Sequence, residues 1–241
     1  MMELMAIIKN EYRKILAKKK SIVLYILTGI IVLGSLIIYY TLSESLKLTV
    51  ISSVYYPIWV LKWMMGFILP LFLAMTVIDT ITGEFQDESI KNVLQLPVER
   101  YQIYLAKLIA NLCYAAGLII TILLVSFIGT IFISGSRAFS ALSETLFSYA
   151  MAFLALGLLI IIISLFALFF KSTSTALTMS ILLAIALNAV GLYYSSLQPY
   201  LPTSYLSIYS KMLNGNMLLY LFSYYIIFTI LGIFKFQAKE V

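Results

Sequence analysis

The chain has 241 residues, of which 63% are hydrophobic and only 11% are charged. Soluble domains contain about 45–50% apolar and about 25% charged residues, so this composition excludes a soluble fold. The net charge of +6 and the mean hydropathy of +1.04 then belong to a polytopic membrane protein, for which we expect no nucleic-acid partner. Because the sequence has no histidine and a single cysteine, Cys113, histidine-based catalysis, a histidine-ligated metal site, a thiolate metal cluster and an intrachain disulfide are excluded.

Residues 1–20 are predicted to contain an amphipathic helix that precedes the first membrane span. Its apolar residues share one face of a helical wheel: Leu4, Met5, Ile8, Tyr12, Ile15 and Leu16. The opposite face is polar and basic: Lys9, Asn10, Arg13 and Lys14. A helix of this kind lies flat in the headgroup layer of the membrane. It serves either as a topology anchor alone or also as a surface that packs on a cytoplasmic partner.

Six long segments have almost no charges. They are roughly 22–42, 57–80, 105–133, 145–170, 172–193 and 217–236. Crossing the hydrocarbon core takes about 20 apolar helical residues, so the predicted fold class is an all-α polytopic membrane protein with six transmembrane helices. Residues 1–241 then form a single transmembrane domain. Pro199 and Pro202 interrupt the apolar run after residue 193, which leaves an extracellular loop at 194–216 before the last span.

The distribution of basic residues predicts the orientation of these spans. If the N-terminus is inside, only Lys47, Arg137 and Lys211 fall in outer loops, and Lys62 lies within the second span. The remaining basic residues all fall inside, so the positive-inside rule places both termini in the cytoplasm. The Ile- and Lys-rich composition is typical of a Gram-positive bacterium, and we therefore expect a location in a bacterial plasma membrane.

Residues 81–100 form the one long cytoplasmic loop. Its apolar residues Ile90, Val93 and Leu94 recur at helical spacing, and Pro97 should end a helix that starts near Glu84. Such a short, charged, amphipathic helix would project from the membrane. Taken alone, the pattern is also compatible with a solvated connector.

This loop resembles the loop between the second and third spans of permeases of the ABC-2 exporter superfamily. The matching positions are Glu84, Glu88-Ser89-Ile90-Lys91, Leu94, Pro97, Arg100 and Lys107. Ser89 departs from the pattern, since glycine is commoner there in that family. In those permeases the loop is a coupling helix that docks into a groove on a separate ATPase subunit.

The resemblance implies a division of labour between polypeptides. No glycine here is followed by lysine, so the phosphate loop G-x-x-x-x-G-K-[ST] is absent. ATP and Mg would therefore bind to the partner subunit, with no cofactor in this chain, and a second permease copy, identical or related, would enclose the path. The residues expected to couple the permease to the ATPase are Glu84, Asp87, Glu88, Ser89, Ile90, Lys91, Val93, Leu94, Pro97 and Arg100.

A second group of residues is a candidate for the transport path or its gate: Trp59, Lys62, Trp63, Tyr200 and Tyr205. A charge within a span usually faces the protein interior or water, although Lys62 could equally extend its ammonium to the membrane surface. The aromatic residues could equally belong to an interfacial belt.

The leading functional hypothesis is the permease subunit of an ATP-driven exporter. The apolar spans favour amphipathic or hydrophobic cargo, namely toxic or antimicrobial peptides, or drugs. A lipid-linked polysaccharide or ion exporter of the same superfamily, or a stand-alone membrane immunity protein, remains an alternative. An intramembrane protease or a proton- or sodium-coupled transporter is disfavoured, because no span carries a central acidic residue.

Overall fold

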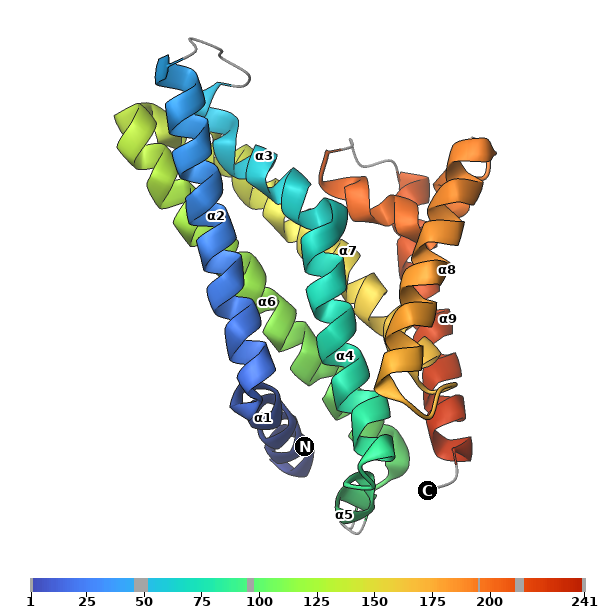
Figure 1. Cartoon of the computed structure of the whole chain (residues 1–241). Coiled ribbons are helices and arrows are strands. Elements are labelled where there is room, and N and C mark those ends of the chain that lie inside the picture. Colours follow the sequence, from blue (N-terminus) through green and yellow to red (C-terminus); the bar gives the residue numbers. More distant parts are fainter. Residues whose placement is uncertain (1, 46–51, 95–97, 195, 211–214, 240–241) are drawn as a thin grey trace.

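The computed structural model describes residues 2–45, 52–94, 98–194, 196–210 and 215–239. Every regular element within these ranges is helical. The long helices run between two ends of the molecule, as Figure 1 shows. We call the end that carries α1, α5 and both chain termini the α1 end, and the opposite end, which carries the 3-10 helix η3, the η3 end.

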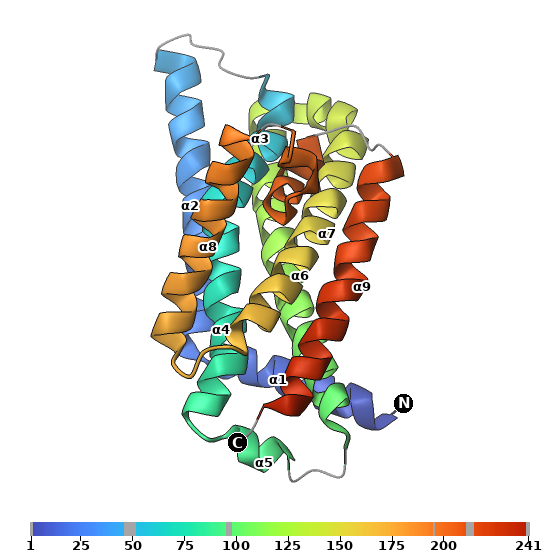
Figure 2. The same cartoon turned by 90° about the vertical axis from the view of Figure 1, so that its right-hand side faces the viewer.

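The first half of the chain contains the first two crossings of the molecule. Its elements are α1 (Met2–Ala17), α2 (Lys19–Ser45), η1 (Ser53–Tyr55), α3 (Tyr56–Trp63), η2 (Met64–Ile68), α4 (Leu69–Gln86) and α5 (Ile90–Leu94). Helix α1 lies across the α1 end, as Figure 2 shows. The segment η2 is a π-helical turn that joins α3 to α4 without a break, so this crossing is one continuous helical stretch.

The second half contains the remaining helices. Its elements are α6 (Arg100–Ser134), η3 (Gly135–Ala141), α7 (Leu142–Ala167), α8 (Thr173–Tyr193), η4 (Gln198–Tyr200), η5 (Pro202–Ser210) and α9 (Gly215–Ala238). Helices α6 and α7 reverse direction at η3 and form an antiparallel hairpin (Figure 1). The expected loop at 194–216 contains η4 and η5, and η5 packs against α7.

Five helical stretches in the described ranges are long and apolar enough to cross a membrane: 19–41, 53–86, 100–167, 173–193 and 217–238. The predicted class, an all-helical multi-pass membrane protein, is therefore confirmed. The third stretch contains both α6 and α7. Six spans require these two helices to cross separately, and that number stays a prediction.

Helices α4, α6 and α7 form the centre of the molecule. Helix α2 packs on α6, while α8 packs on α4 and α9 packs on α7. Close approach between these helices depends on glycine. A Cβ added at Gly117 would lie 2.0 Å from the hydroxyl of Tyr25, and one added at Gly157 would lie 2.1 Å from the hydroxyl of Tyr225. Alanine at either position would force the tyrosine side chain to move away.

The helix expected from Glu84 to Leu96 is divided in two. Helix α4 continues to Gln86, and α5 begins only at Ile90. Between them, Glu88 has a φ of 55°, in the left-handed region that a continuous right-handed helix cannot contain. Two separate helices therefore replace the single helix that the apolar spacing predicts.

Candidate functional site

Helix α1 packs along α6 at the α1 end. The residues that it buries are Ile7, Glu11 and Ile15, which follow one another at four-residue spacing. The expected apolar face is therefore rotated: Met5, which we placed on it, is 69% exposed, whereas Glu11 is 2% exposed. A carboxylate thus occupies the centre of the surface that α1 presents to the protein.

Glu11 belongs to a cluster of four charged side chains, Glu11, Lys14, Glu84 and Lys107, which we call the buried charge cluster. The ammonium Nζ of Lys107 lies 2.7 Å from Glu11 Oε2 and 2.6 Å from Glu84 Oε2. The ammonium of Lys14 lies 2.6 Å from Glu11 Oε1 and 3.4 Å from Glu84 Oε1. Two positive and two negative charges balance. The cluster joins α1, α4 and α6 at a single point.

The electrostatics of the cluster favour the charged forms. Burial alone would raise the pKa of Glu11, but the ammonium groups of Lys107 and Lys14 hold it below its ordinary value. Burial would likewise lower the pKa of Lys14, but hydrogen bonding to Glu11 and the charges of Glu84 and Glu11 raise it. Removal of one partner would leave a buried charge without a counter-charge. This lowers the free energy of unfolding far more than the loss of an exposed ion pair does.

The other side of the α4 C-terminus contacts the segment between α7 and α8. The hydroxyl of Thr82 donates to the carbonyl of Ala167 at 2.8 Å, and so satisfies a free carbonyl at the end of α7. The backbone N–H of Thr173 donates to Gln86 Oε1 at 2.9 Å, and so satisfies a free N–H at the start of α8. Helix α4 therefore holds this connection from both ends.

Helix α9 also contacts the last turns of α4, and the contact is made to Phe85. The ring of Phe236 lies 5.8 Å from that of Phe85, and the ammonium of Lys239 lies 4.3 Å from the centre of the Phe85 ring. Together with the charge cluster and the bonds of Thr82 and Gln86, this contact links the last turns of α4 to α1, α6, α9 and the α7–α8 connection. A displacement of the α4 end would reach each of them.

Arg100 is exposed, and its guanidinium donates to the carbonyl of Gln237 at 3.1 Å. The contact with the partner ATPase that we expect of Arg100 stays a prediction. A cation at this place compensates the free carbonyls and the negative dipole of the α9 C-terminus. In this arrangement Arg100 binds α9 to the start of α6.

The apolar residues of α5 also differ from the prediction. Ile90 is fully buried and Val93 is 7% exposed, and both pack in the core of this chain. They are therefore not available to fill a groove on a partner, because the end of the bundle already covers them. Leu94 ends α5, and Pro97 lies outside the described residues.

Between residues 87 and 91, the residues that face outward are all polar: Asp87, Glu88, Ser89 and Lys91. We call these four residues the exposed loop surface. Glu88 and Lys91 form an ion pair of 2.6 Å with each other. Beside this surface, a cleft of about 590 Å³ lies between α1 and the α4–α5 segment, and its lining includes Lys14, Glu84, Asp87 and Ser89. The exposed loop surface and the buried charge cluster thus share one cleft.

The candidate path and gate residues fall in two separate groups. Trp59 and Trp63 lie on α3 with their rings 6.0 Å apart, and Lys62 between them is exposed. Tyr205 on η5 is 3% exposed and packs on the ring of Tyr224 at 6.0 Å. Tyr200 on η4 packs on the ring of Tyr220 at 5.4 Å, and its carbonyl accepts a hydrogen bond from Tyr224.

Sequence reasoning missed Glu11 and gave Lys107 no role beyond its place in the motif. A signal for Glu11 was present, because it lies four residues after Ile7 and four residues before Ile15. An acidic residue inside an apolar helical face indicates that a basic partner is buried with it. Lys107, seven residues into α6, offered that partner.

These features define a class: a helical, multi-pass membrane protein whose central helices are joined at one end by a buried charge cluster beside a short helix. The ABC-2 family transporter protein model matches residues 7–191, from α1 to the end of α8. The chain belongs to this family. No curated protein gave a significant match. Family membership makes the chain a membrane subunit of an ABC transporter and implies a partnership with an ABC ATPase subunit.

Proposed function

We propose that this chain is the permease subunit of an exporter that moves amphipathic or hydrophobic peptides, including toxic or antimicrobial peptides, or drugs out of a bacterial cell. In this proposal ATP and Mg bind to a separate nucleotide-binding subunit, and two permease copies enclose the path. The α1 end faces the cytoplasm, with six spans and both termini inside. The proposal rests on the way in which the end of α4 is connected.

That end is the place where movement of a partner would enter the bundle. Helix α5 is separated from α4 by only three residues and is fixed to the core by the fully buried Ile90. Directly before it, Glu84 joins the buried charge cluster and Gln86 holds the start of α8. Since packed elements move together rather than deform continuously, displacement of α5 would shift α1, α6 and α8 as a group.

The contact with the ATPase subunit would then be polar. The exposed loop surface carries carboxylates and an ammonium, and Ile90 and Val93 behind it position the backbone. Charged contacts at the rim of an interface mainly set the rate and specificity of association, so single charge changes should weaken coupling gradually. A bulky residue in the middle of the surface should interfere more.

Purification of the tagged permease from its native membrane tests this assignment. We expect an ATPase subunit to co-purify, with ATP hydrolysis that the permease alone lacks. The substitutions Ser89→Trp and Asp87→Lys should reduce both co-purification and hydrolysis. Arg137→Glu, an equally exposed charge change in η3, is the matched control and should leave them unchanged. Co-purification that is equal in all four proteins would contradict a docking role for this loop.

Cysteine labelling tests the orientation separately. On a Cys113→Ser background, Ser136→Cys in η3 should react with an impermeant maleimide in intact cells, whereas Ser89→Cys should react only after the membrane is opened. Both serines are exposed in the structure, so the difference reports the side of the membrane. Labelling of Ser89→Cys in intact cells would reverse the orientation.

The cargo is tested by the ATPase activity of the purified complex. The bundle interior is apolar, so amphipathic peptides should stimulate hydrolysis while small inorganic ions should not. Hydrolysis that depends on sodium and does not respond to peptides would assign the complex to ion export instead.

A further inference from the structure

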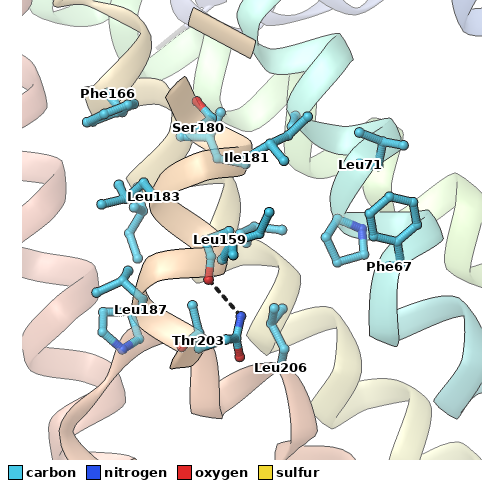
Figure 3. A pocket seen from close by; sticks show the side chains of 18 of the residues that line it. Phe67, Leu71, Leu159, Phe166, Ser180, Ile181, Leu183, Leu187, Thr203 and Leu206 are labelled. Atoms are coloured by element: carbon cyan, nitrogen blue, oxygen red, sulfur yellow. Dashed lines mark hydrogen bonds between the residues drawn. The ribbon is translucent and has the colours of Figure 1, made fainter. Parts of the chain in front are cut away.

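An apolar cavity of about 190 Å³ lies between α4, α7, α8 and η5. Figure 3 shows Leu71, Leu159, Leu183 and Leu206 from these four elements around it, together with Phe67 from η2. An apolar cavity of about 150 Å³ is large enough to bind benzene. The space therefore accommodates a segment of a hydrocarbon chain.

An exposed stripe on α3 and η2 leads directly to this cavity. It consists of Lys62, Trp63, Gly66 and Phe67, all of which are exposed. Gly66 and Phe67 line the cavity. Lys62 precedes Gly66 by four residues, which is about one helical turn, so the two lie on the same side of the helix. The backbone of Lys62 is therefore about one turn from Gly66 at the exposed edge of the cavity.

Lys62 makes no ion pair with any residue in the described ranges. It nevertheless lies inside the apolar stretch 53–86, which is long enough to cross a membrane. An ammonium at such a place requires a counter-charge or contact with water. Its neighbours Trp63 and Phe67 are 65% and 64% exposed, so the described residues of this chain leave the face that carries Lys62 uncovered.

We propose that Lys62 and this cavity form a binding site for an anionic membrane lipid, with one acyl chain in the cavity and the headgroup phosphate paired with Lys62. The two parts of the site match the two parts of the ligand: an apolar space for hydrocarbon and an uncompensated cation for phosphate. A cationic peptide would be repelled by Lys62. The site does not depend on the proposed export function, and it assigns Lys62 to lipid recognition.

The chain carries its own reporter for this site. It has only two tryptophans, Trp59 and Trp63, and they flank Lys62. Lipids with brominated acyl chains quench tryptophan fluorescence on contact. The purified permease, without ATPase or ATP, is placed in nanodiscs that contain the same mole fraction of brominated phosphatidylglycerol or brominated phosphatidylcholine. We expect quenching that corresponds to a preference of about fivefold for phosphatidylglycerol, the factor that one basic residue contributes near anionic lipid.

Two pairs of variants separate the headgroup contact from the cavity. Lys62→Gln should remove the preference, and Lys62→Arg should retain it. Ala184→Phe, which fills the cavity from α8, should weaken the preference, while Ala186→Phe on the same helix is outside the lining and should not. Both changed positions are away from the buried core, and unchanged thermal unfolding confirms that each variant is folded.

Several results would overturn the assignment. Equal quenching by the two lipids in the unchanged protein would exclude a preference, and a preference that survives Lys62→Gln would exclude the ion pair. A preference unaffected by Ala184→Phe would place the lipid outside the cavity. Displacement of phosphatidylglycerol by a small amount of an amphipathic peptide with a free carboxylate would assign the site to cargo instead. A failure of the permease to bind an ATPase would leave all of these results unchanged.

Discussion

The two ends of the molecule are held together by different kinds of interaction. At the α1 end, the buried side chains of Glu11, Glu84 and Lys107 and the half-buried side chain of Lys14 form a cluster of two carboxylates and two ammonium groups. At the η3 end, neutral hydroxyls join the helices: the hydroxyl of Tyr149 donates to the carbonyl of Pro57 at 3.0 Å, and Ser134 donates to Ser53 at 2.6 Å. The first kind responds to pH and to loss of a partner, whereas the second kind does not titrate near neutral pH.

The largest effect should come from the centre of the charge cluster. Lys107→Met would leave the carboxylates of Glu11 and Glu84 buried without their main partner, and we expect a loss of about 3–5 kcal/mol of stability. Thermal or denaturant unfolding of the purified permease measures it. Lys91→Met, which removes an exposed ion pair at the same end, is the control and should have little effect.

A double variant sharpens this prediction. Adding Glu11→Gln to Lys107→Met removes one of the two stranded carboxylates and should restore part of the lost stability, since groups in one network are not additive. If the two substitutions instead destabilise the protein independently, Lys107 and Glu11 do not act as a pair.

Acid should weaken the α1 end before the η3 end. The pKa of Glu11 is lowered in the folded protein, so its contribution is complete above its ordinary pKa of 4.5 and is lost as the pH falls through the lower folded value. The pKa of Lys14 is raised, so its contribution is lost only at strongly alkaline pH. Stability from this pair is therefore greatest between these limits.

Unfolding temperatures measured from pH 7 down to pH 4 and below test this behaviour. The unchanged protein should lose stability steeply at the acid end, and Glu11→Gln should lose less over the same range because its amide does not titrate. Parallel curves for the two proteins would show that Glu11 does not cause the acid sensitivity.

Much of the architecture could be predicted from the sequence, because it depends on long apolar runs. The N-terminal helix expected within residues 1–20 is α1 at Met2–Ala17, and the segment expected at 172–193 is α8 at Thr173–Tyr193. Hydrophobic length and the cost of unpaired backbone groups in lipid determine such elements locally. No knowledge of their neighbours is required.

The candidate site was less predictable, because it depends on which helices meet. A helical wheel predicts that Glu11 is exposed because the residue is charged. It contains no information on Lys107, which is 96 residues away in the sequence. For the same reason, the apolar spacing of Ile90 and Val93 predicted an amphipathic helix but not the surface that covers it. Each error has one cause: tertiary contacts at the end of the bundle decide burial there.

A smaller effect is expected at the η3 end. Tyr149→Phe removes the hydroxyl that contacts the carbonyl of Pro57 and, at 3.2 Å, the hydroxyl of Ser126. A neutral hydrogen bond contributes about 1 kcal/mol, so the unfolding temperature should fall slightly and by the same amount at pH 5 and pH 7. Tyr193→Phe, at an 81% exposed position, is the control. A pH-dependent loss would mean that this end also relies on charge.

The smallest effect on stability is expected from Lys239 at the α1 end. Its ammonium donates to the carbonyl of Phe170 at 3.1 Å. Burial, with a further contribution from the charge of Lys235, lowers the pKa of Lys239 to about 8. Between that pH and the ordinary lysine pKa of 10.5, the folded protein binds fewer protons than the unfolded chain, so stability should rise with pH. The rise should be modest, because solvent screens a group that is only half-buried. We expect the unfolding temperature of the unchanged protein to increase relative to that of Lys239→Gln between pH 8 and pH 10. A decrease would show that the charged form of Lys239 is the stabilising one, and that the α1 end favours each of its buried charges.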